Sequence, residues 1–163
     1  MFIVGSNYLA NKKGSVKMAG TLYICSVKDM NQFEHINKKF VVARKYPYNS
    51  LDELRAYGWD WKYYLAPNKT LYNETMRAKK AGMFNDNYFK NIYCPAYRRQ
   101  LKEQKSSDAL AELVNLLLSN EDVVIACWCT DKFMCHTFCI AQEYKNIGGN
   151  VVMLNKGLLQ ELK

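Results

Sequence analysis

The chain of 163 residues is 49% apolar and 13% aromatic, a composition that is typical of globular proteins and excludes a disordered chain. Its length suits one domain that spans residues 1–163. The net charge of +8 favours an anionic ligand, a nucleotide or a nucleic acid as partner, although basic proteins also use such charge for solubility alone. No apolar run approaches the roughly 20 residues that cross a bilayer, so we expect a cytoplasmic protein without membrane contact.

The first part of the chain predicts short elements separated by polar segments. Residues 2–4 are apolar, and the polar segment 7–17 that follows is expected to be a surface loop near a site. The brief, β-branched segments 22–26 and 40–43 predict strands. Between them, in 28–39, apolar residues recur every three positions, which predicts a short helix with one apolar stripe.

A helix with defined ends is predicted after the proline at position 47. Ser50 can cap its start, and Gly58 can end it after Tyr57. Four aromatic residues then crowd positions 59–64. Such crowding is typical of a packed corner, and stacking on nucleic-acid bases is the alternative.

Three helices are predicted in the middle of the chain. The first two cover 70–80 and 85–105, and the second of these carries many basic residues. We interpret it as a solvated surface helix, with a nucleic-acid groove as the alternative. Ser106 or Ser107 can cap a third helix whose leucines and valine fall at helical spacing up to residue 117, so that one face packs on a sheet.

The last third predicts a β-α-β unit. The continuous apolar run at 123–128 is typical of a central strand that is covered on both faces. A helix is predicted at 135–147, and a second strand at 151–154. The fold class is therefore α/β, a Rossmann-like three-layer domain with a mostly parallel central sheet. The loop at 129–134 follows the carboxyl end of the central strand, where open α/β sheets bind ligands.

The richest chemistry lies at this strand-to-helix junction, and it allows three interpretations. Without a secretion signal its cysteines are expected to be free thiols. In the first interpretation Cys135 or Cys129 is a nucleophile, activated by the helix N-terminus and by neighbouring groups. His136 is then the general base or acid, and Lys132 is a charge partner.

In the second interpretation a zinc ion is bound by Cys127, Cys129, Cys135 and Cys139, although this spacing differs from that of a C-x2-C knuckle. The sequence itself requires no cofactor. In the third, Cys127 and Cys139 are small core residues, and the basic loop only connects two elements. The other histidine, His35, lies in a polar stretch and is expected at the surface. Neither a dinucleotide-binding fingerprint nor a P-loop motif is present.

Several segments together resemble the domain of unknown function 488 family of bacteria and phages. That family has an apolar strand ending in Cys, an aromatic and an acidic residue, then a loop to Phe-Cys-His-Arg. The further matching segments are Val42-Ala43-Arg44-Lys45-Tyr46-Pro47, Leu65-Ala66-Pro67 and Tyr97-Arg98. The resemblance covers most of the chain and implies a compact α/β domain in which Arg44, Cys135 and His136 converge on one pocket.

Two positions depart from the family pattern. Cys129 stands where the family has its acidic residue, and Thr137 stands where it has the arginine after the histidine. If those residues are a general acid or base and an anion clamp, this member has altered or lost activity. Lys132 is a candidate to replace the positive charge, as a point charge and not as a bidentate fork.

We therefore expect an enzyme-like domain that binds or processes a nucleotide or nucleic-acid component. Cys135, His136 and Cys129 are its candidate catalytic residues, and Arg44, Lys132 and Thr137 are its candidate ligand-binding residues. The alternative is a non-catalytic phage accessory protein that binds a nucleotide, a nucleic acid or a host protein. A zinc-binding protein is the second alternative.

Overall fold

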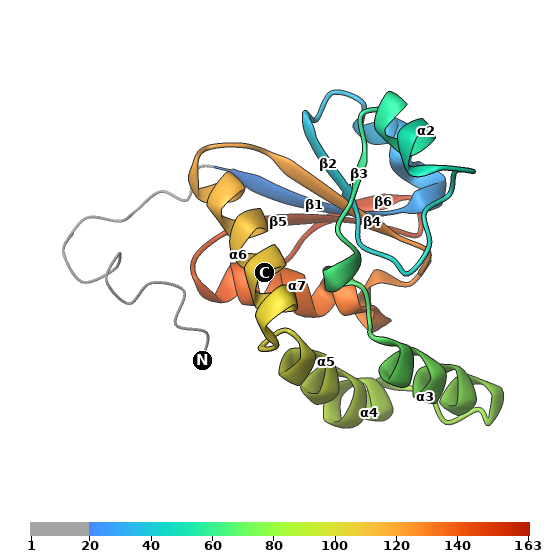
Figure 1. Ribbon diagram of the computed structural model, residues 1–163. Coiled ribbons are helices and arrows are strands. Elements are labelled where there is room, and N and C mark those ends of the chain that lie inside the picture. Colours follow the sequence, from blue (N-terminus) through green and yellow to red (C-terminus); the bar gives the residue numbers. More distant parts are fainter. Residues whose placement is uncertain (1–19) are drawn as a thin grey trace.

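The computed structural model describes residues 20–163, and its centre is one six-stranded sheet with the strand order β3-β2-β4-β1-β5-β6 (Figure 1). The strands are β1 (Thr21–Ser26), β2 (Lys38–Val41), β3 (Asp60–Trp61), β4 (Val123–Cys127), β5 (Asn150–Asn155) and β6 (Leu158–Glu161). All neighbouring strands run parallel except β5 and β6. The predicted α/β class with a mostly parallel central sheet is therefore confirmed. The expected features at 2–4 and 7–17 lie outside the described residues.

Helices cover both faces of the sheet. The short helices η1 (Val27–Phe33) and α2 (Leu51–Ala56) lie on one face, and the longer α6 (Gln104–Leu118) and α7 (His136–Asn146) lie on the other (Figure 1). This arrangement is the expected three-layer fold. Among the described residues, no helix combines the length and the apolar character that crossing a membrane requires.

A helical arm projects from the sheet beyond α7 (Figure 1). It contains α3 (Lys69–Lys80), α4 (Asp86–Tyr88), the π-helix η3 (Phe89–Tyr93) and α5 (Cys94–Gln100). Two single-turn 3-10 helices, η2 (Tyr63–Leu65) and η4 (Lys132–Met134), lie before the arm and before α7. The arm also carries one wall of a cavity that borders the carboxyl ends of the strands.

The sequence explains where β4 and α2 form and where α2 begins and ends. Every residue of β4 is buried, and β4 lies between β2 and β1, so its continuous apolar run reflects a central strand. The Ser50 side chain accepts a hydrogen bond from the Glu53 amide and caps α2. Gly58, directly after that helix, has φ +76°, a conformation that glycine adopts without steric cost.

Three predicted elements differ from the structure. The helix expected at 85–105 stops at Gln100, and α6 begins anew at Gln104. Ser106 does not cap α6, because its hydroxyl donates to the Tyr64 carbonyl. The helix expected at 28–39 is only a 3-10 helix, since the chain must turn into β2 at Lys38. The expectation that Ser106 or Ser107 starts α6 was wrong, because α6 begins earlier, after Glu103.

Side chains of α5 hold the segment that connects η2 to α3. The buried Tyr97 hydroxyl donates to the Leu65 carbonyl. The Gln100 amide donates to the Ala66 carbonyl at 2.7 Å and accepts from the Asn68 amide at 2.8 Å. Asn68 in turn caps α3 through the Leu71 amide. The start of α3 is therefore fixed by two side chains of α5.

Candidate functional site

The site lies where the chain leaves two neighbouring strands in opposite directions. From β1 the chain passes to β2, whereas from β4 it passes to β5, which lies on the other side of β1. Such a switch point leaves a crevice at the carboxyl ends of the strands. Ser26, the last residue of β1, pairs in register with Cys127, the last residue of β4. The predicted position of the site after β4 thus coincides with the topological switch.

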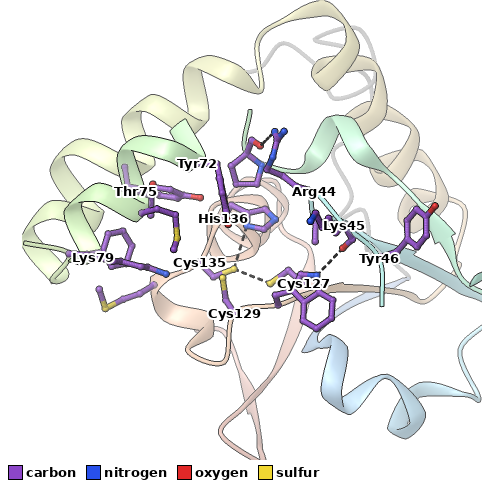
Figure 2. Close-up of a pocket in the computed structure, with 17 residues that line it drawn as sticks. Arg44, Lys45, Tyr46, Tyr72, Thr75, Lys79, Cys127, Cys129, Cys135 and His136 are labelled. Carbon is purple, nitrogen blue, oxygen red and sulfur yellow. Dashed lines mark hydrogen bonds between the residues drawn. The ribbon is translucent and has the colours of Figure 1, made fainter. Parts of the chain in front are cut away.

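A cavity of about 460 Å³ opens at this edge (Figure 2). This size is within the range of small-molecule sites. The loop after β2 and the helix α3 form its sides, and the junction between β4 and α7 forms its floor. The residues that line it include Ala43, Arg44, Lys45, Tyr46, Tyr72, Thr75, Met76, Lys79, Phe84, Tyr93, Cys127, Trp128, Cys129, Met134, Cys135 and His136.

At the floor, His136 has a defined tautomer. Its Nε2 lies 2.6 Å from the Val42 carbonyl oxygen, and because a carbonyl only accepts, Nε2 carries the hydrogen. The unprotonated Nδ1 then faces the Cys135 sulfur at 3.5 Å. Burial lowers the pKa of His136, although the Cys127 sulfur and the Val42 carbonyl act against this. A neutral imidazole with a free lone pair toward a thiol is the arrangement of a general base.

Cys135 is the N-cap residue of α7, and its sulfur is surrounded by polar groups. The Cys127 sulfur lies 3.1 Å away, and the Thr137 hydroxyl donates to the Cys135 sulfur at 3.2 Å. Burial raises the pKa of the Cys135 thiol, but hydrogen bonds from Cys127 and Cys129 and the charge of Lys132 outweigh it. The pKa of Cys135 is therefore held well below the ordinary value of 9.0.

Lys132 is fully buried beside these thiols. Its ammonium donates to the Cys127 sulfur at 3.0 Å, and its backbone amide donates to the Asn155 side chain. Burial acts to lower the pKa of Lys132, but the neighbouring sulfurs of Cys127 and Cys135 raise it overall. A buried ammonium is tolerated only with a partner, and within the described part of the chain that partner is a thiol sulfur.

The mouth of the cavity combines cations with aromatic rings. The Arg44 guanidinium donates to the Pro67 carbonyl and lies over the rings of Tyr63 and Tyr72, 5.7 and 5.8 Å from their centroids. The Trp128 indole donates to the Lys45 carbonyl and closes one side. Figure 2 shows Arg44, Lys45 and Lys79 around the same opening.

The structure places the predicted catalytic and ligand-binding residues in two groups. Arg44, Cys129, Cys135 and His136 all line the cavity. Lys132 and Thr137, which were expected to bind ligand, are fully buried and are not among the described residues that line it. Both instead contact the thiols from behind, through the Cys127 and Cys135 sulfurs.

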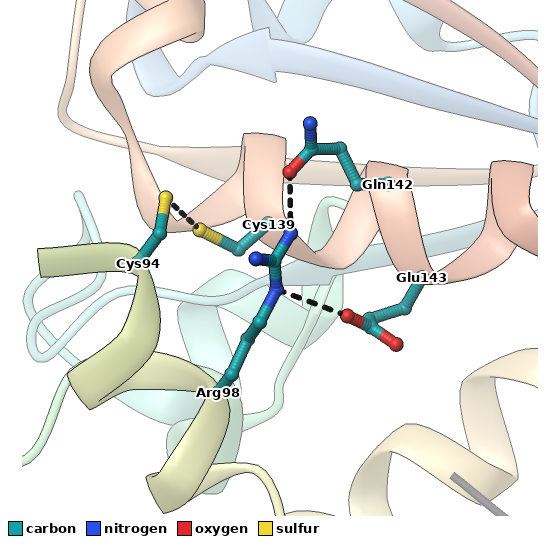
Figure 3. Close-up of polar contacts among 5 residues, drawn as sticks. All are labelled: Cys94, Arg98, Cys139, Gln142 and Glu143. Atoms are coloured by element: carbon teal, nitrogen blue, oxygen red, sulfur yellow. Dashed lines mark hydrogen bonds and ion pairs between the residues drawn. The ribbon is translucent and has the colours of Figure 1, made fainter. Parts of the chain in front are cut away.

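Only three of the four cysteines in the zinc interpretation lie close together. The sulfurs of Cys127, Cys129 and Cys135 lie within 4.8 Å of one another. Cys139 is separate, because its sulfur lies 2.9 Å from that of Cys94 on α5 (Figure 3). Cys139 is therefore a core residue between α5 and α7, and not a fourth ligand.

No local sequence pattern indicates the cavity wall on α3. Tyr72, Thr75 and Lys79 reach the site only because α5 fixes the start of α3 more than 20 residues earlier in the chain. Lys45 could have been recognised, since it directly follows Arg44 in a matching segment. Asn155, which holds the Lys132 backbone, comes from β5 and has no sequence signal of its own.

Comparison with known proteins gave one family. A family model described as the active DUF488-N3 subclade matches residues 22–146. Neither curated proteins nor solved structures gave a match. The matched residues extend from β1 to the end of α7 and include the whole cysteine and histidine junction. The chain therefore belongs to the domain of unknown function 488 family.

Proposed function

We propose that this protein is an enzyme that uses Cys135 as a nucleophile on a nucleotide or a nucleic-acid component. The observation that carries the proposal is the pair of contacts made by His136. The Val42 carbonyl fixes the Nε2 hydrogen, and this leaves Nδ1 as a base 3.5 Å from the Cys135 sulfur. That separation suits a resting enzyme, in which catalytic hydrogen bonds are often long.

The groups around Cys135 support a nucleophilic role. Lys132 supplies a positive charge next to the thiol cluster, and the Thr137 hydroxyl donates to the Cys135 sulfur. Both stabilise a thiolate, which is the reactive form of cysteine. Cys129 stands in place of an acidic residue, so it adds a third sulfur to the site where the family has a carboxylate. The description of the matched family model as an active subclade is in keeping with catalysis.

The lining of the cavity supports a nucleotide as substrate. Tyr72, Tyr93 and Trp128 present aromatic surface to the cavity, and Arg44 and Lys79 present positive charge. Aromatic rings suit a base, and cations suit a phosphate. This is the reason to place a nucleotide, and not a neutral metabolite, at this opening.

The test is the alkylation rate of Cys135 as a function of pH, read by mass spectrometry. We expect a reaction midpoint below that of a free thiol, and protection by nucleoside monophosphates or a short single-stranded oligonucleotide. In His136→Ala the midpoint should rise. Cys25 is an internal control, because burial raises the pKa of its thiol to about 12. An ordinary midpoint for Cys135 together with no protection by any nucleotide contradicts the proposal.

A second candidate function is zinc binding by Cys127, Cys129 and Cys135, which the grouping of their sulfurs favours. These residues would form a three-thiolate site with one open position. Two features oppose the fit. The Cys127 and Cys135 sulfurs are only 3.1 Å apart, and a zinc ion with bonds of about 2.3 Å in tetrahedral geometry holds its sulfurs farther apart. The Lys132 ammonium also contacts one would-be ligand.

Metal analysis decides between the two functions. Protein purified without a histidine tag is measured for zinc, beside a Cys129→Ser variant. About one equivalent in the unmodified chain, lost in the variant, supports the zinc site. Absence of zinc from both removes this second candidate.

A further inference from the structure

Two pairs of buried thiols lie within hydrogen-bond distance in the described part of the chain, and only one of them borders the cavity. The Cys127 and Cys135 sulfurs are 3.1 Å apart, and both residues line the cavity. The Cys94 and Cys139 sulfurs are 2.9 Å apart. The second pair is enclosed between α5 and α7, and neither of its members is among the described residues that line the cavity.

The two pairs also differ in their nearest cation. The Lys132 ammonium is fully buried and donates directly to the Cys127 sulfur. Near the other pair, the Arg98 guanidinium donates to Gln142 at 2.7 Å and to Glu143 at 3.2 Å, and so its hydrogen bonds go to α7 (Figure 3). The Lys132 charge therefore favours the thiolate form within the Cys127 and Cys135 pair, and the thiolate is the reactive form of cysteine.

We propose that Cys127 and Cys135 are a peroxide-reactive dithiol, in which Cys135 is oxidised first and Cys127 then closes a disulfide with it. The proposal rests on Cys135 being the reactive thiol of the proposed function, and it adds a second reaction with a hydroperoxide as the substrate. It also gives Cys127 a role that nucleophilic catalysis by Cys135 alone does not require.

The reaction has two steps. The Cys135 thiolate attacks an oxygen of the hydroperoxide, so that an S–O bond forms, the O–O bond breaks, and the leaving alkoxide or hydroxide takes up a proton. Cys135 is then a sulfenic acid. The Cys127 thiolate attacks the Cys135 sulfur, the S–S bond forms, the S–O bond breaks, and hydroxide leaves and is protonated to water. The two thiols lose two electrons in total, and these reduce one peroxide.

The geometry supports the second step. A disulfide requires its sulfurs about 2.05 Å apart, so the sulfurs of Cys127 and Cys135 must approach by only about one ångström from their separation of 3.1 Å. Cys135 lies at the start of α7 and Cys127 at the end of β4. We expect side-chain rotation at these two element ends to bring the sulfurs together.

The experiment treats the full chain with equimolar hydrogen peroxide, blocks the remaining thiols under denaturing conditions, and maps disulfides by mass spectrometry without reduction. We expect a Cys127–Cys135 disulfide with the loss of both thiols, while Cys94 and Cys139 remain free. Cys127→Ser should instead trap Cys135 as sulfenic acid, detected with dimedone, and then accumulate sulfinic acid. Cys94→Ser, the matched control in the other thiol pair, should form the Cys127–Cys135 disulfide as the unmodified chain does.

Several results overturn this inference. One is a disulfide between Cys94 and Cys139 in the same or greater yield, and another is a disulfide that uses Cys129 in place of Cys127. A third is oxidation of Cys135 in the unmodified chain without any disulfide. If Cys135 is alkylated at low pH and protected by nucleotides but forms no disulfide, this inference fails and the proposed function stands. If Cys135 reacts with neither reagent, both fail.

Discussion

Replacing Lys132 by methionine tests the electrostatics of the thiol cluster most directly. Methionine keeps the length and apolar stem of the side chain and removes the ammonium that lies 3.0 Å from the Cys127 sulfur. The folded chain holds this charge in a fully buried position. The substitution should therefore change the reactivity of the thiols far more than the packing around them.

The size of the effect follows from the distance. At 3.0 Å, two unit charges attract by roughly 5 kcal/mol at an effective dielectric constant of about 20. Burial of both groups offsets much of this attraction. A remaining attraction of about 1.4 kcal/mol already corresponds to a shift of one pKa unit. Since the positive charge stabilises the thiolate, its removal must raise the pKa of Cys135. We expect the alkylation midpoint of Cys135 to rise by at least about one unit, which slows its alkylation about tenfold at pH values below the midpoint.

The assay is iodoacetamide alkylation across pH, with the modified peptides quantified by mass spectrometry. Lys79→Met is the matched control, because Lys79 lines the same cavity and its ammonium lies 4.9 Å from the Phe84 ring centroid instead of at a sulfur. The free energy of unfolding of Lys132→Met should change by less than about 1 kcal/mol, because the thiols can take up a proton and no unpaired charge remains. An unchanged midpoint, or an equal shift in Lys79→Met, would refute the reasoning.

Three further outcomes concern stability. Because burial lowers the pKa of His136, the unfolded chain binds a proton more readily, so the free energy of unfolding should fall as pH drops below about 6.5. His136→Asn should lose this dependence in a denaturant titration series, and an unchanged slope would contradict the assignment. Tyr97→Phe leaves the Leu65 carbonyl without its donor and should cost about 1–3 kcal/mol in urea unfolding; a loss near zero would mean that water replaces the hydroxyl. Gly149→Ala places a methyl group 2.3 Å from the Tyr144 ring and should lower stability by about 1–3 kcal/mol, and an unaffected thermal midpoint would argue against this tight contact.

The position of the site could be predicted from local patterns. The apolar run of β4, the cysteines after it and the glycines after α7 define a strand, a loop and a helix, and the carboxyl end of a central parallel strand is where ligands bind. The residues that complete the site could not be found this way. Val42, which fixes the His136 tautomer, is 94 positions away in the chain. It acts through its backbone carbonyl, which every residue type has, so the sequence cannot indicate this contact.

The same limit applies to the cysteines and to Lys132. Spacing suggested that Cys139 joins the other junction thiols, because it lies one helical turn after Cys135. The packing of α5 against α7 brings Cys94 to it instead, across 45 positions. Lys132 was expected to bind a ligand, yet the Asn155 side chain accepts a hydrogen bond from its backbone amide and the buried ammonium contacts the Cys127 sulfur. In both cases tertiary contacts, and not local preference, decide where the side chain points.

Because α5 holds α3 in place, the shape of the cavity wall and the contacts of the reactive thiols depend on different residues. The wall of the cavity on α3 depends on Tyr97 and Gln100, whereas the contacts among the thiols come from β4 and α7. Substitutions at Tyr72, Thr75 or Lys79 can therefore reshape what the cavity admits without disturbing a single hydrogen bond at Cys135. A library varied at these three positions would change ligand selectivity while the reactive centre keeps its pH profile.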